Sequence, residues 1–366
     1  MNRRTAVFAL AVLAAGPSLL CTCSTAPEAR VVPLRGINLA GAEFGHEKPG
    51  FSCATPGVYG KDWTYPGEST VAYFARHGLR LFRLPFRWER LQPALGCDFD
   101  PAEQRRLARF LDLARSYECR VILDLHNYGR YALPTSGTTR EFIVDELSGD
   151  RAPVTSADFA DLWQRLATVF KDHRALHGYG LMNEPHDMGA SDWKAMSQTA
   201  VDAIRAVDLG TAIYVSGLEW SKSYRWSEAN GPSAWIRDPS GNVVYEAHCY
   251  FDEDGSGRYQ VSFQDELRRD LRLLDRGVAR LEDFAQWCAR NGVRGFLGEY
   301  GVPRDEPRWH EALTRFLARI DELGMESACW AAGEWWGDYP LSVQPGHAFV
   351  SDSPLLPRLK RRPQPR

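Results

Sequence analysis

Two glutamates end two of the short apolar runs in this chain, and their positions suit them to acid–base or nucleophilic chemistry. Glu184 stands between Asn183 and Pro185, and Glu299 closes the run that begins at Gly295. Two carboxylates that face each other across a cleft meet the requirements of glycosidic bond cleavage. One donates a proton to the leaving oxygen, and the other attacks or stabilises the anomeric carbon. The pair therefore predicts a glycosidase.

Other apolar runs also end in polar or aromatic side chains that could position these carboxylates. These residues are Arg83, His126, Asn183, His248, Tyr250 and Trp330. Each has an ordinary structural explanation by itself, because a strand-end arginine commonly pairs with an acid and a tryptophan commonly packs in a core. A whole set of runs that end in this way favours a functional site. Arg83 and Tyr250 are expected to hold Glu299 ionised, whereas Glu184 is expected to be partly protonated near the working pH.

The elements that must position these residues are β-branched apolar runs that alternate with amphipathic stretches. Strands are expected to begin near Leu34, Leu79, Arg120, Leu176, Ala212, Asn242, Gly295 and Ser327. Helices are expected at residues 101–117, 156–170, 191–207 and 306–323, the second with Ser156 as its N-cap. The alternation predicts an α/β fold, a single (β/α)8 TIM barrel with its active site at the C-terminal ends of the strands.

The expected domain organisation is a leader, one catalytic domain and a tail. In residues 1–25, two arginines precede an apolar run that ends near Cys21, Cys23 and small residues, as in a signal peptide or lipoprotein leader. The run is too short for an ordinary membrane-spanning helix, so an uncleaved anchor is the less favoured alternative. Residues 31–350 are expected to form the catalytic domain, and residues 351–366 a basic, solvated Pro/Arg-rich tail. We therefore expect a secreted or periplasmic protein, with lipid anchoring through Cys21 or Cys23 left open.

Composition and motifs argue against several other classes of protein. A formal net charge of -3 supplies no long-range field for nucleic acid. The acidic turn that begins at Asp252 has Phe263 at the twelfth position of a calcium loop, where a glutamate is needed. There is no His-Glu-x-x-His pair and no Gly-x-Gly-x-x-Gly after a strand. We expect a monomer that needs no metal, cofactor or protein partner.

Cysteines lie both in the expected leader and beyond it. Those beyond the leader are Cys53, Cys97, Cys119, Cys249, Cys288 and Cys329. Export permits disulfides, and Cys53 with Cys97 is the preferred pair because both lie in Gly/Pro-rich sequence. For Cys119, which precedes an apolar run, a buried free thiol is an equal or better interpretation.

The strand-end residues together resemble glycoside hydrolase family 5, the cellulase A family. The near-invariant positions of that family are matched in order by Arg83, His126, Asn183, Glu184, His248, Tyr250, Glu299 and Trp330. Residues 35–38 and 41–45 resemble the opening of its endoglucanase branch, and residues 330–339 resemble the closing segment. The resemblance extends from about residue 34 to residue 344.

The resemblance implies a retaining endo-β-1,4-glucanase that acts on cellulose-type β-glucan by double displacement. Glu184 would then be the acid/base and Glu299 the nucleophile, and Asn183 would donate a hydrogen bond to the 2-hydroxyl of the sugar in subsite −1. Trp330 would form the platform under that sugar. The role implied for the remaining matched residues is to position and tune the two acids. These residues are Arg83, His126, His248 and Tyr250.

Several points stay open at this level. Trp220 and Trp226, after the fifth expected strand, are further candidates for stacking on sugars, with core packing as an equal alternative. Glu334 departs from the usual residue of the branch, which leaves the polarity near subsite −2 open. Other substrates, namely xyloglucan, mixed-linkage glucan or mannan, remain alternatives. A non-catalytic polysaccharide-binding protein is also possible, although the presence of both Glu184 and Glu299 argues against it. Retention predicts carboxyl groups about 5–5.5 Å apart, against about 6.5–9.5 Å for inversion.

Overall fold

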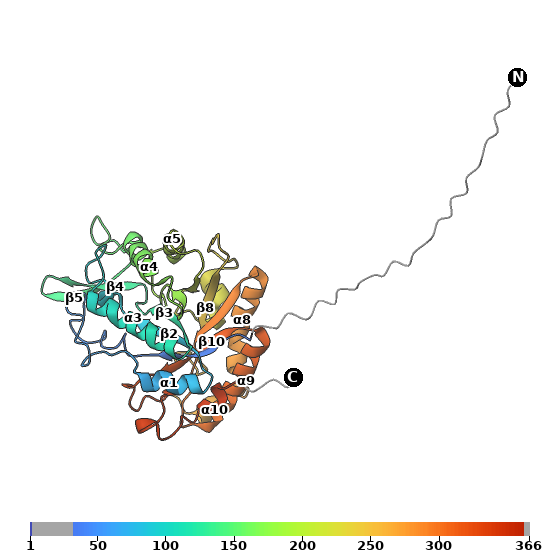
Figure 1. The fold of residues 1–366 in the computed structure, drawn as a ribbon. Helices are drawn as coiled ribbons and strands as arrows, with labels where there is room; N and C mark the ends of the chain where they lie inside the picture. Colours follow the sequence, from blue (N-terminus) through green and yellow to red (C-terminus); the bar gives the residue numbers. More distant parts are fainter. Residues whose placement is uncertain (2–31, 362–366) are drawn as a thin grey trace. The chain divides into compact units, whose positions relative to one another are not determined.

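Eight parallel strands close into a barrel in the computed structural model, which describes residue 1 and residues 32–361 (Figure 1). The strand order around the barrel is β1-β10-β9-β8-β7-β6-β3-β2. The strands are β1 (Arg35–Leu39), β2 (Leu81–Phe86), β3 (Arg120–Leu125), β6 (Leu176–Gly180), β7 (Ala212–Ser216), β8 (Val243–His248), β9 (Arg294–Glu299) and β10 (Glu326–Ala332). Each begins within about two residues of its expected start, and the predicted (β/α)8 barrel is confirmed.

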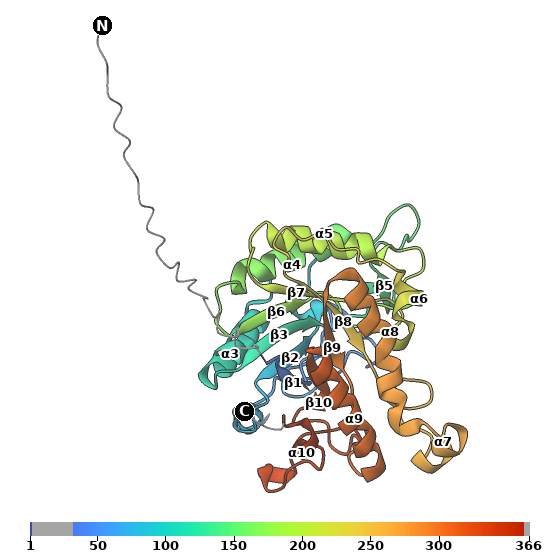
Figure 2. The ribbon, with the colours of Figure 1, turned by 90° about the vertical axis from the view of Figure 1, so that its right-hand side faces the viewer.

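Helices surround the barrel, as the view in Figure 2 shows for α3, α4, α5, α8 and α9. The longer helices are α1 (Glu68–Arg76), α3 (Pro101–Ser116), α4 (Ser156–Phe170), α5 (Trp193–Arg205), α8 (Arg276–Asn291) and α9 (Pro307–Leu323). Shorter ones are α2 (Trp88–Leu91), α6 (Trp226–Asn230), α7 (Phe263–Arg269) and α10 (Leu356–Leu359). A hairpin of β4 (Arg130–Thr135) and β5 (Thr138–Ile143) follows β3. The predicted helices correspond to α3, α4, α5 and α9, whereas α1, α8 and the hairpin were not predicted.

The N-cap of α4 lies one residue earlier than predicted. Thr155, with extended backbone angles, accepts a hydrogen bond from the Asp158 backbone N–H, and the Asp158 side chain accepts one from the Thr155 backbone N–H. This reciprocal capping box requires an acceptor three residues after the cap, and only a cap at Thr155 places Asp158 there. The Ser156 hydroxyl instead bonds to Asp145.

The interior of the barrel changes character along the strands. Its lower part is an apolar cluster of Leu81, Ile122, Tyr214, Val244, Phe296 and Ala328. Side chains of a strand alternate between its two faces, so the residue two positions further along also points inward. For β2, β3 and β8 that next residue is Arg83, Asp124 and Glu246 respectively, and all three are buried. The C-terminal end of the barrel is therefore lined by charge.

The predicted disulfide between Cys53 and Cys97 is wrong, because the six cysteines in the described part of the chain are all free thiols. Cys53 is fixed against β4 by a 3.0 Å hydrogen bond from its backbone N–H to Ala132 O, whereas Cys97 is exposed in the loop after α2. Cys119 is buried, as the sequence favoured, and burial raises its pKa to about 11. Such a thiol acts as an apolar packing group.

The structure differs from the prediction that a solvated tail begins at residue 351. The segment expected to begin a solvated tail instead places Leu355, Leu356 and Leu359 in the core, and Arg361 pairs with Asp321 of α9 at 3.0 Å. The predicted leader, residues 1–25, lies outside the described residues apart from Met1. Among the helices that the structure describes, none has the length and hydropathy needed to cross a membrane.

Candidate active site

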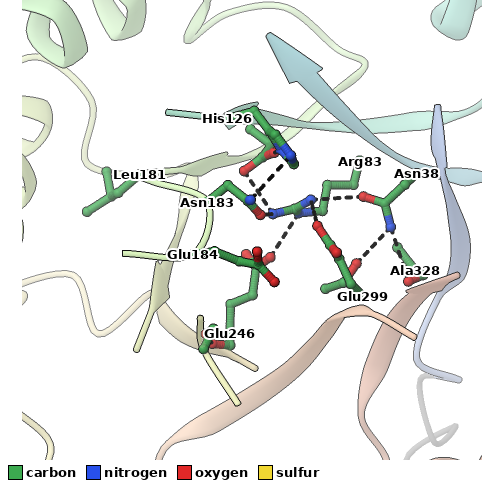
Figure 3. Close-up of polar contacts among 12 residues, drawn as sticks. Asn38, Arg83, His126, Leu181, Asn183, Glu184, Glu246, Glu299 and Ala328 are labelled. Carbon is green, nitrogen blue, oxygen red and sulfur yellow. Dashed lines mark hydrogen bonds and ion pairs between the residues drawn. The ribbon is translucent and has the colours of Figure 1, made fainter. Parts of the chain in front are cut away.

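Arg83, from the middle of β2, lies at the centre of the predicted site residues (Figure 3). Its buried guanidinium donates through Nη1 to Glu299 Oε1 at 3.1 Å and through Nη2 to Asn183 Oδ1 at 2.7 Å. Nη2 also donates to Asp124 Oδ1 at 2.9 Å, and Nε lies 2.8 Å from Glu246 Oε1. One arginine thus joins four strands and the loop after β6, and it fixes the positions of the acids around it.

Glu299 ends β9 with its side chain almost completely buried. Its Oε1 accepts from Arg83, and its Oε2 accepts from the Tyr250 hydroxyl at 2.8 Å. Burial is the largest influence and raises the pKa of Glu299, while the charges of His248 and Arg83 and the Tyr250 hydroxyl lower it. Arg83 and Tyr250 therefore act in the predicted direction, but burial, together with the charge of Glu184, outweighs them.

Glu184 lies in the loop after β6, four residues beyond the end of that strand at Gly180. Its φ of 43° is in the left-handed region, which is costly for a residue other than glycine and is characteristic of functional positions. Its side chain is 18% exposed, against 5% for Glu299, so Glu184 is the acid that faces the open cleft. Oxygen atoms of Glu184 and Glu299 and a ring nitrogen of His248 all lie within 4.8 Å of one another.

His248, the last residue of β8, connects the two acids. Its Nδ1 lies 2.7 Å from Glu184 Oε1 and 3.7 Å from Glu299 Oε2, and its Nε2 lies 3.2 Å from Glu246 Oε1. Burial lowers the pKa of His248, but the three carboxylates together raise it to about 10. A doubly protonated ring can donate to Glu184 and Glu246 at once. Glu184, His248 and Glu299 form the one cluster in the described residues close enough to bind a metal ion, and a proton on His248 opposes that role.

His126 and Asn183 form the opposite side of the site. His126 Nδ1 lies 2.8 Å from Asp124 Oδ2, and its Nε2 lies 3.3 Å from Asn183 Nδ2. Burial and the charge of Arg83 hold the pKa of His126 well below its usual value, so the ring is neutral. A proton on Nδ1 satisfies Asp124 and leaves Nε2 to accept from the amide of Asn183. Since Arg83 donates to the oxygen of the Asn183 amide, the orientation of this amide is fixed.

Three further residues of this network were not predicted as site residues. Asp124 and Glu246 bind Arg83, and each lies two positions before a predicted histidine, His126 directly after β3 and His248 at the end of β8. Strand alternation, applied to His126 and His248, would have placed both acids on the inner face. Asn38 on β1 accepts from Arg83 Nη1 at 2.9 Å and donates to Gly298 O at 2.8 Å (Figure 3).

Two hollows flank the pair of glutamates. The Trp330 hollow, of about 380 Å³, is lined by residues that include Glu43, His46, His126, Trp330, Trp335 and Trp336. The Lys222 hollow, of about 490 Å³, is lined by residues that include Glu184, Trp220, Lys222, His248, Tyr250 and Arg258. A larger hollow of about 900 Å³ lies at the other end of the barrel, near the first residues of β6, β7 and β9, and is remote from both glutamates.

The predicted tryptophans have different surroundings. Trp330 is half-buried and stacks on His126 with ring centroids 5.5 Å apart and planes inclined by 15°, which places it beside the network. Trp220 lines the Lys222 hollow and stacks on His186 at 4.4 Å. Trp226 is fully buried and packs against Trp235 and other aromatic rings, so its predicted role as a sugar platform is wrong. Nothing in the sequence around the two residues distinguishes Trp226 from Trp220.

Glu334 does not set the polarity of the cleft beside Trp330. Its Oε1 accepts from the Gly67 backbone N–H at 2.8 Å and from the Thr70 hydroxyl at 2.7 Å. These donors belong to the N-terminus of α1, where a carboxylate is stabilised by unpaired backbone N–H groups. Glu334 thus fixes the loop after β10 to α1.

Comparisons with known proteins agree with this geometry. The family model described as cellulase (glycosyl hydrolase family 5) matches residues 37–335. The endo-β-1,4-glucanase B of Aspergillus niger is 30% identical over 326 residues, 88% of each chain. The structure of Pseudomonas stutzeri endoglucanase Cel5A in complex with cellobiose is 37% identical with a TM-score of 0.77 and covers 89% of this chain and 91% of its own. XacCel5A in complex with cellopentaose is 34% identical with a TM-score of 0.74, and coverage is 90% and 98%.

Proposed function

The chain belongs to the cellulase family, glycosyl hydrolase family 5, and is a glycoside hydrolase; from that membership we propose that it is a retaining endo-β-1,4-glucanase. Relatives and structural neighbours that carry the name endoglucanase support this substrate class. Complexes of two neighbours with cellobiose and cellopentaose support a β-glucan oligosaccharide as ligand. The enzyme is proposed to act as a monomer.

The main support for a retaining mechanism is the short distance between the two acids. Oxygen atoms of Glu184 and Glu299 lie within 4.8 Å of each other. Retaining glycosidases hold their carboxyl groups about 5–5.5 Å apart, whereas inverting enzymes need about 6.5–9.5 Å to admit a water molecule. The separation therefore supports direct attack by one carboxylate on the sugar.

In the proposed first step, Glu299 attacks the anomeric carbon while Glu184 donates a proton to the leaving oxygen. Glu299 is the more buried acid and is oriented by Arg83 and Tyr250, as a nucleophile requires. In the second step, Glu184 accepts a proton from water, whose oxygen displaces Glu299 from the same carbon. Between the steps, His248 Nδ1, 2.7 Å from Glu184 Oε1, can donate a hydrogen bond to the carboxylate that Glu184 has become.

The remaining residues are proposed to hold the sugar that is attacked. Arg83 and His126 orient the amide of Asn183, which can donate its second N–H to the 2-hydroxyl of that sugar. Trp330 lies next to His126 and offers an aromatic face for the apolar face of the pyranose. The Trp330 hollow then receives the part of the chain on the nucleophile's side.

Export is a separate proposal, supported by the leader-like sequence of residues 1–25. It no longer includes oxidised cysteines, since the six described thiols are free. Mass spectrometry of the envelope fraction should find a mature chain that begins after Leu20. An intact Met1 end there would contradict export by cleavage.

A panel of purified β-glycans tests the proposed activity. Cellulose-type and mixed-linkage glucan, xyloglucan, mannan and neutral cello-oligosaccharides should be compared by the reducing ends released. We expect the highest rate on β-1,4-glucan, with early internal cuts, and NMR should detect the β-anomer first. A preference for mannan or xyloglucan, or initial release of the α-anomer, would refute the corresponding part of the proposal.

A further inference from the structure

The Lys222 hollow lies on the leaving-group side of the cleft if Glu184 is the acid, and this step rests on the proposed function. Glu184 lines this hollow and not the Trp330 hollow. An acid must lie next to the oxygen that it protonates, so the sugar attached to that oxygen extends away on the acid's side. The hollow is therefore where the leaving sugar binds.

Two acids of the 252–259 loop accept hydrogen bonds from that same loop, and one of them, Asp254, lines this hollow. Asp252 accepts hydrogen bonds at 3.1 Å from the backbone N–H groups of Gly257, Arg258 and Tyr259 and from the Ser256 hydroxyl. Asp254 Oδ1 accepts from the Ser256 backbone N–H at 3.0 Å. These bonds close the 252–259 loop and orient it toward the hollow, but they leave the side chain of Arg258 without an acidic partner.

Two cations remain available in the hollow. Within residues 32–361, neither the Lys222 ammonium nor the Arg258 guanidinium has a hydrogen-bond acceptor or an ion-pair partner, and Arg258 is exposed. Lys222 Nζ lies 4.8 Å from the centroid of the Trp220 ring. The backbone of Lys222 is fixed beside His248 by an isolated bridge between the two residues. The neighbouring Arg225, in contrast, pairs with Glu228.

The two hollows differ in charge. The residues that line the Trp330 hollow include Glu43 and Glu47 but no lysine or arginine. The Lys222 hollow is lined by two cations that lack a partner in the described chain, together with the carboxylates of Glu184 and Asp254. A neutral glucan would use both sides through hydroxyl groups and ring faces alone. Unpaired ammonium and guanidinium groups bind a carboxylate more strongly than a hydroxyl.

We propose that the Lys222 hollow binds a leaving sugar that carries a carboxylate, with Lys222 and Arg258 as its partners. The carboxylate can belong to a terminal aldonate or to a C6 uronate unit of a β-1,4-glucan. The enzyme then prefers partly oxidised glucan chains, cut so that the acidic unit leaves with the released end. Trp220, held against His186, supports the sugar ring at this position.

The first test compares cellopentaonic acid with cellopentaitol, which share an opened terminal ring and differ in charge. At low salt, kcat/KM for the acid should exceed that for the alditol about 3- to 10-fold, as expected for two solvent-accessible ion pairs. The ratio should fall toward one near 0.5 M NaCl, because salt screens the attraction. It should also fall toward one in Lys222→Met/Arg258→Met. Lys61→Met, which removes an exposed lysine outside the hollow, should keep the wild-type ratio.

A second test uses C6-oxidised cellulose against hydroxyethylcellulose, so that the uronate and aldonate sources are separated. If only the aldonate or only the uronate substrate is cut faster than its neutral counterpart, that result identifies which carboxylate the hollow binds. Mass spectrometry should then find the acidic unit on the released side of the cut. A wild-type ratio of one on both pairs, or a ratio unchanged by Lys222→Met/Arg258→Met, overturns the inference. Failure to cut neutral cellopentaose would instead overturn the proposed function.

Discussion

The two ends of the barrel interior are built by the same strands and the same alternation, yet they differ in chemistry. Leu81, Ile122 and Val244 form part of the apolar lower cluster, whereas Arg83 and Glu246, two residues further along β2 and β8, are charged and buried. The lower layer stabilises the fold by removing apolar surface from water. The upper layer holds charges out of water, which is costly unless each charge is paired.

Stability and chemistry are therefore separated along each strand. Arg83 offsets its own burial by contacts with Asp124, Glu246 and Glu299 at 2.8 to 3.1 Å. Removing one member changes the charge around all the others, although Arg83 keeps its remaining acids, so the upper layer behaves as a unit. Substitutions in the lower layer should change the unfolding free energy more than turnover. Substitutions in the upper layer should change turnover more than the unfolding free energy.

The largest expected effect is on turnover in the upper layer. Glu299→Ala should lower kcat on every substrate at least about 10⁴-fold, because no other group can form the glycosyl intermediate. Its unfolding free energy should change little, since burial already disfavours the charged form of Glu299. Kinetics and urea denaturation of the same preparation check both parts. Residual turnover within tenfold of wild type would contradict the nucleophile assignment.

Glu184→Ala should lower the rate on polysaccharide much more than the rate of the first step on an activated substrate. An activated aryl glycoside needs little protonation to leave, so its first step should survive and the glycosyl-enzyme should accumulate, while polysaccharide is cut about 10²- to 10⁴-fold more slowly. Azide, which needs no general base, should rescue this variant and give a β-glycosyl azide. An α-glycosyl azide from Glu299→Ala, with no rescue of Glu184→Ala, would exclude the assigned roles.

Gly298→Ala should disturb the upper layer without removing any of its groups. A Cβ at Gly298 would lie 2.0 Å from Glu246 Oε1, so Glu246 must move away from Arg83 and His248. We expect kcat/KM to fall about 10- to 100-fold and the pH–rate profile to shift, because His248 loses a carboxylate partner. Gly210→Ala, where the nearest atom is at 3.8 Å, is the matched control. An unchanged pH profile would indicate that Glu246 does not tune His248.

Ile122→Ala tests the lower layer. Deleting most of this fully buried side chain should lower the unfolding free energy by about 2–5 kcal/mol. The folded fraction should keep kcat/KM within about threefold of wild type, because Asp124 remains on the same strand. Leu209→Ala, at a position that is 67% exposed, should change stability by less than about 0.5 kcal/mol. A fall in kcat/KM of the folded fraction well beyond threefold would contradict the separation of stability and chemistry between the two layers.

The smallest expected effect concerns pH. The carboxylates raise the folded-state pKa of His248 from 6.5 to about 10, so its protonated form stabilises the fold below about pH 6.5, and that contribution is lost as pH rises toward 10. The difference in unfolding free energy between wild type and His248→Gln should therefore shrink across this window. Chemical denaturation at pH 6, 8 and 10 measures it. A difference that grows with pH would show that His248 is neutral in the folded protein.

The strand ends could be predicted because they are local features. Apolar runs of strand length predicted the barrel. Arg83, Glu184 and Glu299 stand in or directly after such runs, so a short stretch of sequence was enough to identify each of them. Asp124 and Glu246 lie inside those same runs, and recognising them required knowledge of which face of each strand points inward. The first residues of each strand were located because β-branched periodicity does not depend on tertiary neighbours.

Burial and the partners of each side chain were decided by tertiary structure alone. Trp220 and Trp226 both lie between β7 and β8, yet one lines a hollow and the other packs against Trp287 of α8, because elements distant in the sequence determine what covers each ring. Likewise the raised pKa of Glu299 depends on its burial and on charges from other strands. The barrel and the residues at its rim could be predicted from the sequence, since both follow from local periodicity. The folded chain decided which of those residues meet, because contacts between strands depend on closure of the whole barrel.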